Sequence, residues 1–205
     1  IHFGYGLNDW KDLQELILTG PFDSFGLLKK SYRNTVEISD FATEILRHGN
    51  FPIYPVEPVI RHGNAVEICD CVNEKAMLEK TVELIRKWQQ AGHETIAVIC
   101  RDEEETKEVS VRLGEKIPLV NSDLSTAEFG SGVMVLPVEY TKGLEFDAVL
   151  LYHPSEEHYP SEDAYVKLLY VAATRALHEL AVVHTGDLTD LIGTKVSEEK
   201  RIHSL

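Results

Sequence analysis

The sequence is poor in positive charge and in cysteine, and it contains no long apolar run. It has 20 lysines and arginines against 34 aspartates and glutamates, which gives a net charge of −14. A surface built mainly to hold nucleic acid needs more cations than this, because it must neutralise phosphates. An acidic body can still contain a local basic groove, and acidic faces also serve protein partners or solubility.

The apolar stretches are too short for a membrane span, since a transmembrane helix needs about 20 consecutive apolar residues. No basic segment followed by an apolar one opens the chain, so we expect no signal peptide. We therefore expect a cytoplasmic protein with no membrane partner. The chain begins at Ile1 rather than at a methionine, which suggests a fragment of something longer.

The three cysteines are Cys69, Cys71 and Cys100, and they form no CxxC pair. No histidine lies near them at the spacing of a metal ligand, and the nine histidines are scattered. We therefore expect free thiols in a reducing cytosol, and we expect no metal site.

The 205 residues are 43% apolar, which is enough to bury a sizeable core in a single domain spanning 1–205. Runs that are apolar on both faces predict covered strands, and they alternate with amphipathic helices. This pattern predicts an α/β fold with a mostly parallel sheet flanked by helices. Helices are predicted over 10–20, 35–49, 73–90, 102–114 and 164–176, and strands over 95–101, 117–121, 133–138, 147–152 and 180–185.

Three further segments have less regular patterns. Residues 58–72 predict a hairpin that turns at Gly63 and Asn64, and one short helix is predicted within 188–205. Residues 139–146 join two strands that we expect to be parallel, although such crossovers usually need about a dozen residues. The local pattern there favours a hairpin.

The segment "VEYTKGLEFDAVLLY" (138–152) places two charges and a glycine between two apolar runs. In open α/β sheets ligands lie beyond the carboxyl ends of the strands, and this segment follows such an end. Gly143 lets the backbone approach a ligand closely, Lys142 suits an anion and Glu145 can accept hydrogen bonds from hydroxyl groups. A solvated loop with a turn glycine is the alternative, and the spacing does not exclude it.

The segment "KLLYVAATRAL" (167–177) is apolar almost all round, which predicts a buried helix. Arg175 at its end needs an anionic partner, because burying an unpaired guanidinium is costly. Either Glu179 forms a structural ion pair with it, or Arg175 points at a phosphate across an interface. Earlier in the chain, Tyr32 and Arg33 could hold a base and a phosphate.

Together and in this order, three stretches resemble motifs of the second motor domain of UvrD/Rep-type superfamily 1 helicases. "SYRNTVEISDFATEIL" is similar to motif IV, "VEYTKGLEFDAVLLY" to motif V and "KLLYVAATRALHELAVV" to motif VI. The resemblance implies a RecA-like, P-loop NTPase-type fold of three layers. It also implies that a helical turn joins two parallel strands at 139–146, in place of a hairpin. On this basis we divide the chain into a leading segment (1–27), a core (28–185) and a tail (186–205).

The resemblance implies roles for the matching side chains. Tyr32 would stack on the adenine of ATP. Arg33 and Arg175 would contact the γ-phosphate as catalytic residues, with Arg175 as an arginine finger. Thr174 would help to place Arg175.

The resemblance implies that the loop of the motif V segment binds the nucleotide as well. Glu145 would bind the ribose with support from Gly143, and Lys142 would lie in the loop that couples nucleotide to movement. The chain contains no GxxxxGK[ST] motif, so the resemblance implies that ATP and Mg²⁺ are shared with an N-terminal RecA-like domain upstream of Ile1. We expect the fragment alone to bind ATP and DNA weakly and to be inactive.

The sequence departs from the usual motif V of this family at one position. There Glu139 replaces a histidine, in a segment that contacts single-stranded DNA. A carboxylate there would repel a phosphate strand. Glu139 followed by Tyr140 resembles the HelD-like branch, whose members associate with RNA polymerase and remove it from DNA. RNA polymerase is therefore a further partner to consider.

Three functions remain open from the sequence. The first is the C-terminal motor domain of an ATP-dependent DNA helicase or translocase. The second is an RNA-polymerase-recycling ATPase without processive unwinding, and the third is a non-catalytic protein-binding module on the same fold. A stand-alone small-molecule enzyme has little support, since no Ser/His/Asp or Cys/His pairing is readable.

Overall fold

The computed structural model describes residues 34–53, 61–120 and 130–193. Its elements, in chain order, are α3 (Val36–Leu46), β1 (Glu67–Cys71), α4 (Glu74–Gln90), β2 (Thr95–Cys100), α5 (Glu103–Gly114), β3 (Gly132–Pro137), the 3-10 helix η2 (Val138–Tyr140), β4 (Phe146–Tyr152), α6 (Asp163–Ala173) and β5 (Ala176–Thr185). The predicted helix over 10–20 lies outside the described residues.

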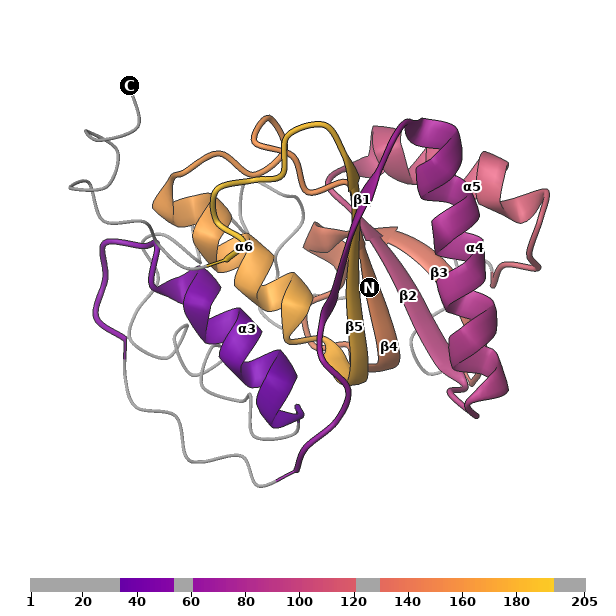
Figure 1. Ribbon diagram of the computed structural model, residues 1–205, viewed down its shortest axis with the longest axis horizontal. Coiled ribbons are helices and arrows are strands. Elements are labelled where there is room, and N and C mark those ends of the chain that lie inside the picture. Colours follow the sequence, from indigo (N-terminus) through magenta and orange to yellow (C-terminus); the bar gives the residue numbers. More distant parts are fainter. Residues whose placement is uncertain (1–33, 54–60, 121–129, 194–205) are drawn as a thin grey trace.

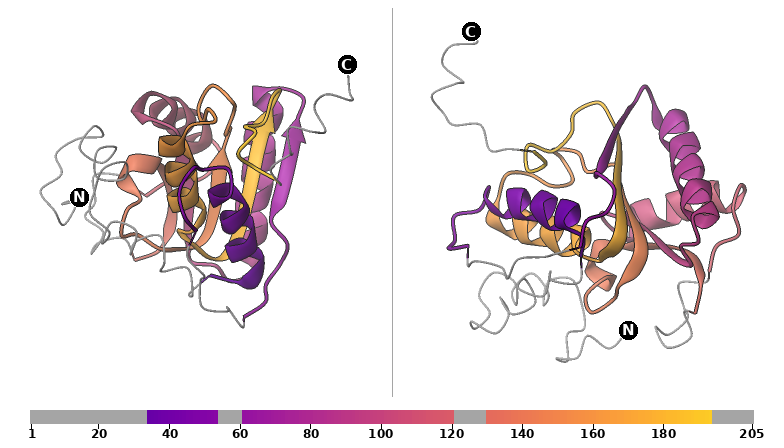
Figure 2. Two further views of the ribbon diagram at one scale, coloured as in Figure 1. Left: turned by 90° about the vertical axis from the view of Figure 1, so that its left-hand side faces the viewer. Right: turned by 60° about the horizontal axis from the view of Figure 1, so that its bottom comes forward.

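The described strands form one sheet in the order β1-β5-β4-β2-β3, and each neighbouring pair is parallel. Figures 1 and 2 show α3 and α6 on one face of this sheet and α4 and α5 on the other. Alternate strand residues enter the two cores, so Ile96 and Val98 pack with α4 and α5 while Ala97 and Ile99 pack with α3 and α6. The prediction of an α/β fold with a parallel sheet between helical layers is confirmed.

Helices α3, α4 and α5 begin where polar side chains cap them, whereas α6 begins after Glu162 without a side-chain cap. Thr35 accepts a hydrogen bond from Ile38 N at 3.3 Å, Asn73 from Ala76 N at 2.8 Å and Asp102 from Glu105 N at 2.8 Å. Such caps satisfy backbone donors that the first turn of a helix leaves without partners. The predicted helices over 35–49, 73–90, 102–114 and 164–176 are confirmed by the observed elements, with ends that differ by a few residues.

The predicted hairpin over 58–72 is wrong. Strand β1 pairs in parallel with β5, far along the chain, and the described residues before it (61–66) form no strand. The amide of Gly63 donates instead to Glu37 Oε2 at 2.8 Å, which ties this segment to α3. A turn-forming Gly-Asn pair can be read from the sequence, but the partner of a strand is decided by long-range packing.

Two shorter predictions also differ from the structure. Residues 117–120 form no strand, although Val120 N donates to Val133 O at 2.8 Å. Residues 188–193 form no helix, and the rest of the segment predicted to contain one lies outside the described residues.

The connection between β3 and β4 is the short crossover that the motif resemblance implies. It contains η2, and β2 lies between the two parallel strands. Pro137 is level with Cys100 at one end of β2, and Ala148 is level with Ile96 at the other. The loop therefore returns from the carboxyl edge of the sheet to its amino edge, and the local expectation of a hairpin is wrong.

Candidate functional site

Two segments that carry predicted site residues meet at the amino edge of the sheet. The loop 141–145 leads into β4, and the end of α6 leads into β5. Phe146 N donates to Arg175 O at 2.9 Å, and Phe146 is in register with Ala176. The structure therefore places Lys142, Gly143 and Glu145 on the loop that meets Arg175. We expected a site beyond the carboxyl ends, and that prediction is wrong for this cluster.

Arg175 directs its guanidinium back over the end of α6 and the loop. Its Nε donates to Val171 O at 3.0 Å, Nη1 to Leu144 O at 3.3 Å and Nη2 to Thr174 Oγ1 at 3.3 Å. All three acceptors are neutral oxygens, so these bonds orient the group without cancelling its charge. Among the described residues no carboxylate lies within 4.0 Å of it.

The structure excludes the ion pair with Glu179 that the sequence left open. Glu179 accepts a hydrogen bond from Asn64 Nδ2 at 2.6 Å and lies 3.8 Å from His93 Nε2. Glu179 thus contacts Asn64 and His93 rather than Arg175.

The charge of Arg175 is partly buried. Burial lowers its pKa, while the nearby Glu145 and Tyr170 act in the opposite direction. A guanidinium stays protonated in proteins in any case. It lies at the carboxyl end of α6, where the helix dipole favours a cation. The arrangement keeps a positive charge, fixed in direction, at the edge of the sheet.

Thr174 is hydrogen-bonded to the guanidinium of Arg175. The buried hydroxyl donates to α6 carbonyls, at 2.9 Å to Tyr170 O and 3.1 Å to Val171 O. The same oxygen accepts the bond from Arg175 Nη2. Thr174 therefore connects the guanidinium to the last turn of its own helix.

The loop has a defined turn at Gly143. Leu144 N donates to Thr141 O at 3.0 Å, and Gly143 has a φ of +77°. That φ is expected at the third position of a type II turn, where residues with a side chain are strained. Among the described residues, no atom lies within 4 Å of the position that a Cβ would occupy there. The glycine is needed for its backbone conformation and leaves open space in front of the turn.

Lys142 and Glu145 flank this turn. Lys142 is half-buried, and burial lowers the pKa of its amine. Glu145 is exposed and close enough to Arg175 to influence its pKa. The turn thus places an exposed carboxylate and an exposed glycine beside a fixed guanidinium, whereas the amine nitrogen of Lys142 is buried.

Asn34 is a residue of this site that the sequence reasoning did not single out. It is 1% exposed, and its Nδ2 donates to Thr174 O at 3.0 Å and to Ala176 O at 2.5 Å. Tyr32 and Arg33, which directly precede it, lie outside the described residues. The sequence offered one hint of its role, which is that Asn34 is a polar residue next to Tyr32 and Arg33.

Glu139 and Tyr140 lie at the opposite, carboxyl edge of the sheet. Tyr140 Oη donates to Glu103 Oε1 at 2.6 Å. Burial, and then the charge of Glu103, raise the pKa of Glu139. A shallow groove there is lined by Glu139 and the charged residues Asp102, Glu103, Glu104, Lys107 and Glu108. Glu139 therefore belongs to an acidic surface, and the repulsion of a phosphate strand there stays a prediction.

Within the described ranges no group of three or more histidines, cysteines, aspartates and glutamates could hold a metal ion. Cys69 and Cys71 are half-buried and Cys100 is buried, all as free thiols. Over the same part of the chain, no helix combines the length and apolar character needed to cross a bilayer.

Comparison with known proteins points to one kind of protein. Residues 132–183, which contain the loop and the Arg175 junction, match the UvrD-like helicase C-terminal domain family. The structure is similar to that of the C-terminal domain of a possible DNA helicase from Lactobacillus plantarum WCFS1. The TM-score is 0.67 at 28% identity, over 82% of this chain and 96% of the other. The fold matches a helicase C-terminal domain. No curated protein matches the chain.

These similarities support a helicase-like function in general terms, and an enzyme that includes such a domain. They support the resemblance to UvrD-like helicases. The HelD-like branch has no such support and stays a hypothesis, as do the roles of individual residues.

Proposed function

We propose that this chain is the C-terminal motor domain of an ATP-dependent DNA helicase or translocase. In this role it presents Arg175 to ATP held by an N-terminal, Walker-bearing RecA-like domain of the same protein. The observation that carries the proposal is the fixed guanidinium of Arg175 at the amino edge, bonded to three neutral oxygens. A guanidinium in this state is suited to stabilise the charge that develops on a transferred phosphoryl group.

The other residues of the loop fit the same nucleotide. The exposed carboxylate of Glu145 can accept hydrogen bonds from both ribose hydroxyls, and the open space at Gly143 lets the sugar approach the backbone. Lys142 would add positive charge near the phosphates. In this proposal Tyr32 stacks on the adenine and Arg33 joins Arg175 at the γ-phosphate, while Mg²⁺ is held by the first domain.

The proposal is tested first by the upstream coding sequence, which must contain a Walker loop. In the protein that joins the two domains, Arg175→Ala should lower kcat for ATP hydrolysis by about 10³-fold or more. Arg86→Ala is the matched control, because Arg86 is exposed on α4, on the other face of the sheet. Unchanged turnover in the Arg175 variant would contradict the proposal and favour a non-catalytic binding module.

One observation favours a second function, which is recycling of RNA polymerase without processive unwinding. The groove beside Glu139 is acidic at the place where the resembled helicases contact single-stranded DNA. A protein partner suits such a surface better than a phosphate chain. Strand displacement by the two-domain protein supports the helicase, whereas capture of RNA polymerase without strand displacement supports the alternative.

A further inference from the structure

The backbone on both sides of Arg175 is held by side chains from a distant segment. At this junction α6 ends and β5 begins, so the carbonyls cannot all find partners within the helix. Asn34 Nδ2 bonds the carbonyls of Thr174 and Ala176, which flank Arg175. A primary amide has two hydrogens on one nitrogen and can therefore serve both carbonyls at once. The other amide atom, Oδ1, is buried without a partner among the described residues, so the two donor bonds define what Asn34 does there.

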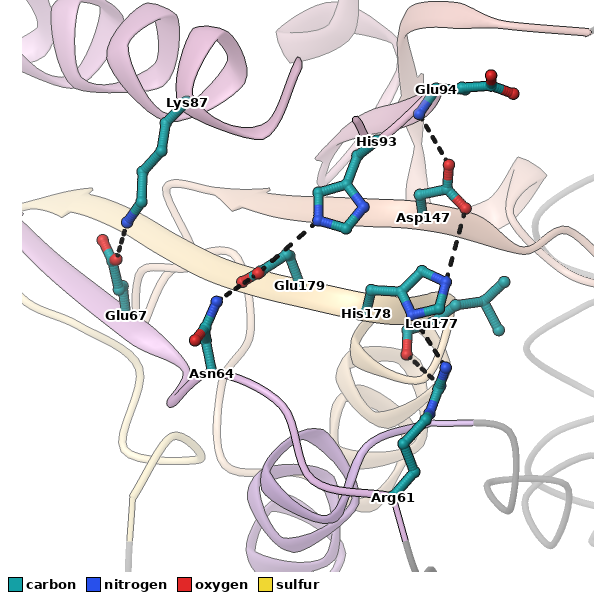
Figure 3. Close-up of polar contacts among 10 residues, drawn as sticks. All are labelled: Arg61, Asn64, Glu67, Lys87, His93, Glu94, Asp147, Leu177, His178 and Glu179. Atoms are coloured by element: carbon teal, nitrogen blue, oxygen red, sulfur yellow. Dashed lines mark hydrogen bonds and ion pairs between the residues drawn. The ribbon is translucent and has the colours of Figure 1, made fainter. Parts of the chain in front are cut away.

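A second side chain continues this clamp along β5. Arg61 Nη2 donates to Leu177 O at 2.7 Å, and its Nη1 lies 3.0 Å from His178 Nδ1 (Figure 3). The arginine can only donate, so the imidazole nitrogen of His178 is the acceptor. With the bond from Phe146 N to Arg175 O, each of the carbonyls from Thr174 to Leu177 has a donor from another segment.

The two clamping residues are themselves connected through α3. Asn34 immediately precedes Thr35, the N-cap of α3, and Val36 N donates to Arg61 O at 2.8 Å. Helix α3 packs in the same core as α6. The start of α3 and the start of β5 thus form one unit, and the direction of the Arg175 backbone depends on it.

We propose that Asn34, assisted by Arg61, is a positioning residue for Arg175. Asn34 touches no nucleotide in this proposal and acts only by fixing the backbone from which the guanidinium projects. The inference rests on the proposed function, because positioning matters only if Arg175 takes part in ATP hydrolysis. A displacement of about 1 Å at a reacting group can cost on the order of 10²-fold in rate.

The alternative is that Asn34 only stabilises the fold. Such a residue would alter the fraction of folded protein and leave the rate per folded molecule unchanged. A positioning residue lowers that rate, and its effect disappears once Arg175 is gone. A double-mutant cycle therefore separates the two roles.

The experiment uses the two-domain protein and measures kcat and KM for ATP, corrected for the folded fraction by circular dichroism. Asn34→Ala should lower kcat by about 10-fold or more, with KM changed by less than about 3-fold. Asn34→Ser retains one donor and should fall between this variant and the wild type. Asn64→Ala is the control, because Asn64 bonds a side chain, Glu179, and no carbonyl of the junction.

Single-turnover rates complete the cycle. Asn34→Ala combined with Arg175→Ala should be no slower than Arg175→Ala alone. The inference is overturned if the two losses multiply, or if Asn34→Ala turns over like the wild type while Arg175→Ala is inactive. If Arg175→Ala itself has full activity, it is the proposed function that fails.

Should Asn34→Ala not fold, Arg61→Met tests the same clamp through Leu177 O. Its kcat should fall by about 3-fold or more, and an unchanged kcat overturns the inference.

Discussion

Arg175 Nη1 donates to Leu144 O across 3.3 Å, which joins the end of α6 to the loop before β4. The two residues are 31 positions apart in the sequence. Through this bond, and through the bond from Phe146 N to Arg175 O, the guanidinium and the loop with Lys142 and Glu145 form one body. A nucleotide that contacts either segment would therefore contact a surface whose parts are already in place.

Arg175→Lys should destabilise the 205-residue chain even though it keeps the charge. A single ammonium group cannot replace three donors that point at Val171 O, Leu144 O and Thr174 Oγ1. Val171 O keeps the bond from the Thr174 hydroxyl, but Leu144 O loses the guanidinium donor. A partly buried acceptor that loses its partner costs about 1–2 kcal/mol in the free energy of unfolding, which urea titration measures. Arg86→Lys on the exposed face of α4 should change it by less than about 0.5 kcal/mol. Equal stabilities of the two variants would show that the three hydrogen bonds contribute nothing.

Much of the fold could be predicted from the sequence, because local signals determine its helices and strands. The amphipathic pattern over 35–49 predicts α3, and apolar runs without alternation predict strands such as β2 and β4, which are covered on both faces. The order of strands is not a local property. The Gly63-Asn64 pair predicted a hairpin, yet β1 pairs with β5, and α4 packs against both of these strands.

The candidate site was predicted in its parts but not in its place. Lys142, Gly143, Glu145 and Arg175 were singled out from the residue pattern, and Thr174 from the motif resemblance alone. Their position at the amino edge depends on a crossover that passes β2, and nothing in the local pattern gives its direction. Asn34 was missed because its acceptors are 140 and 142 residues away along the chain.

Gly143→Ala should lower stability for reasons of backbone conformation alone. The φ of +77° disfavours any residue with a Cβ, although space for the Cβ is open. We expect a loss of about 1 kcal/mol in the free energy of unfolding. Gly143→Asn should cost less, since asparagine tolerates this region better.

Gly130→Ala is the matched control for this prediction. In the described part of the chain, no atom lies within 4 Å of the position that a Cβ would take at Gly130, and its φ is not in the positive range. This substitution should be neutral or slightly stabilising. If both alanine variants lose the same stability, the turn conformation is not the cause.

Glu37→Gln should change how the chain unfolds in acid. The Gly63 amide, His62 and the backbone amide of Glu37 itself lower the pKa of Glu37 from 4.5 to about 2. A carboxylate with a depressed pKa stabilises the folded state above the unfolded value, and that contribution is lost as the pH falls through the folded value. The difference in melting temperature between wild type and Glu37→Gln should therefore be full above about pH 4.5 and vanish near pH 2.

Glu104→Gln is the control in the same melting experiment. It removes the same charge from an exposed position on α5 and leaves the contact between α3 and Gly63 intact. A Glu37→Gln difference that stays constant from about pH 5 to about pH 2 would contradict the assigned cause.

Glu105→Gln should have the opposite pH dependence, because the side chain of Glu105 is only 13% exposed. Burial raises the pKa of Glu105 to about 7, against the opposing effects of the Arg101 amide at 3.0 Å and of His158. A group with a raised pKa supports the folded state below its unfolded value, near 4.5, and that support is lost as the pH rises through about 7. Glutamine stays neutral and can still accept the bond from the Arg101 amide. Between about pH 5 and about pH 8 the variant should therefore gain about 1–3 kcal/mol in unfolding free energy relative to wild type.

Glu108→Gln, an exposed position on the same helix, should show no such gain. Parallel stability curves for wild type and Glu105→Gln would mean that Glu105 ionises normally, and that its contact with His158 at 3.4 Å fully offsets the burial.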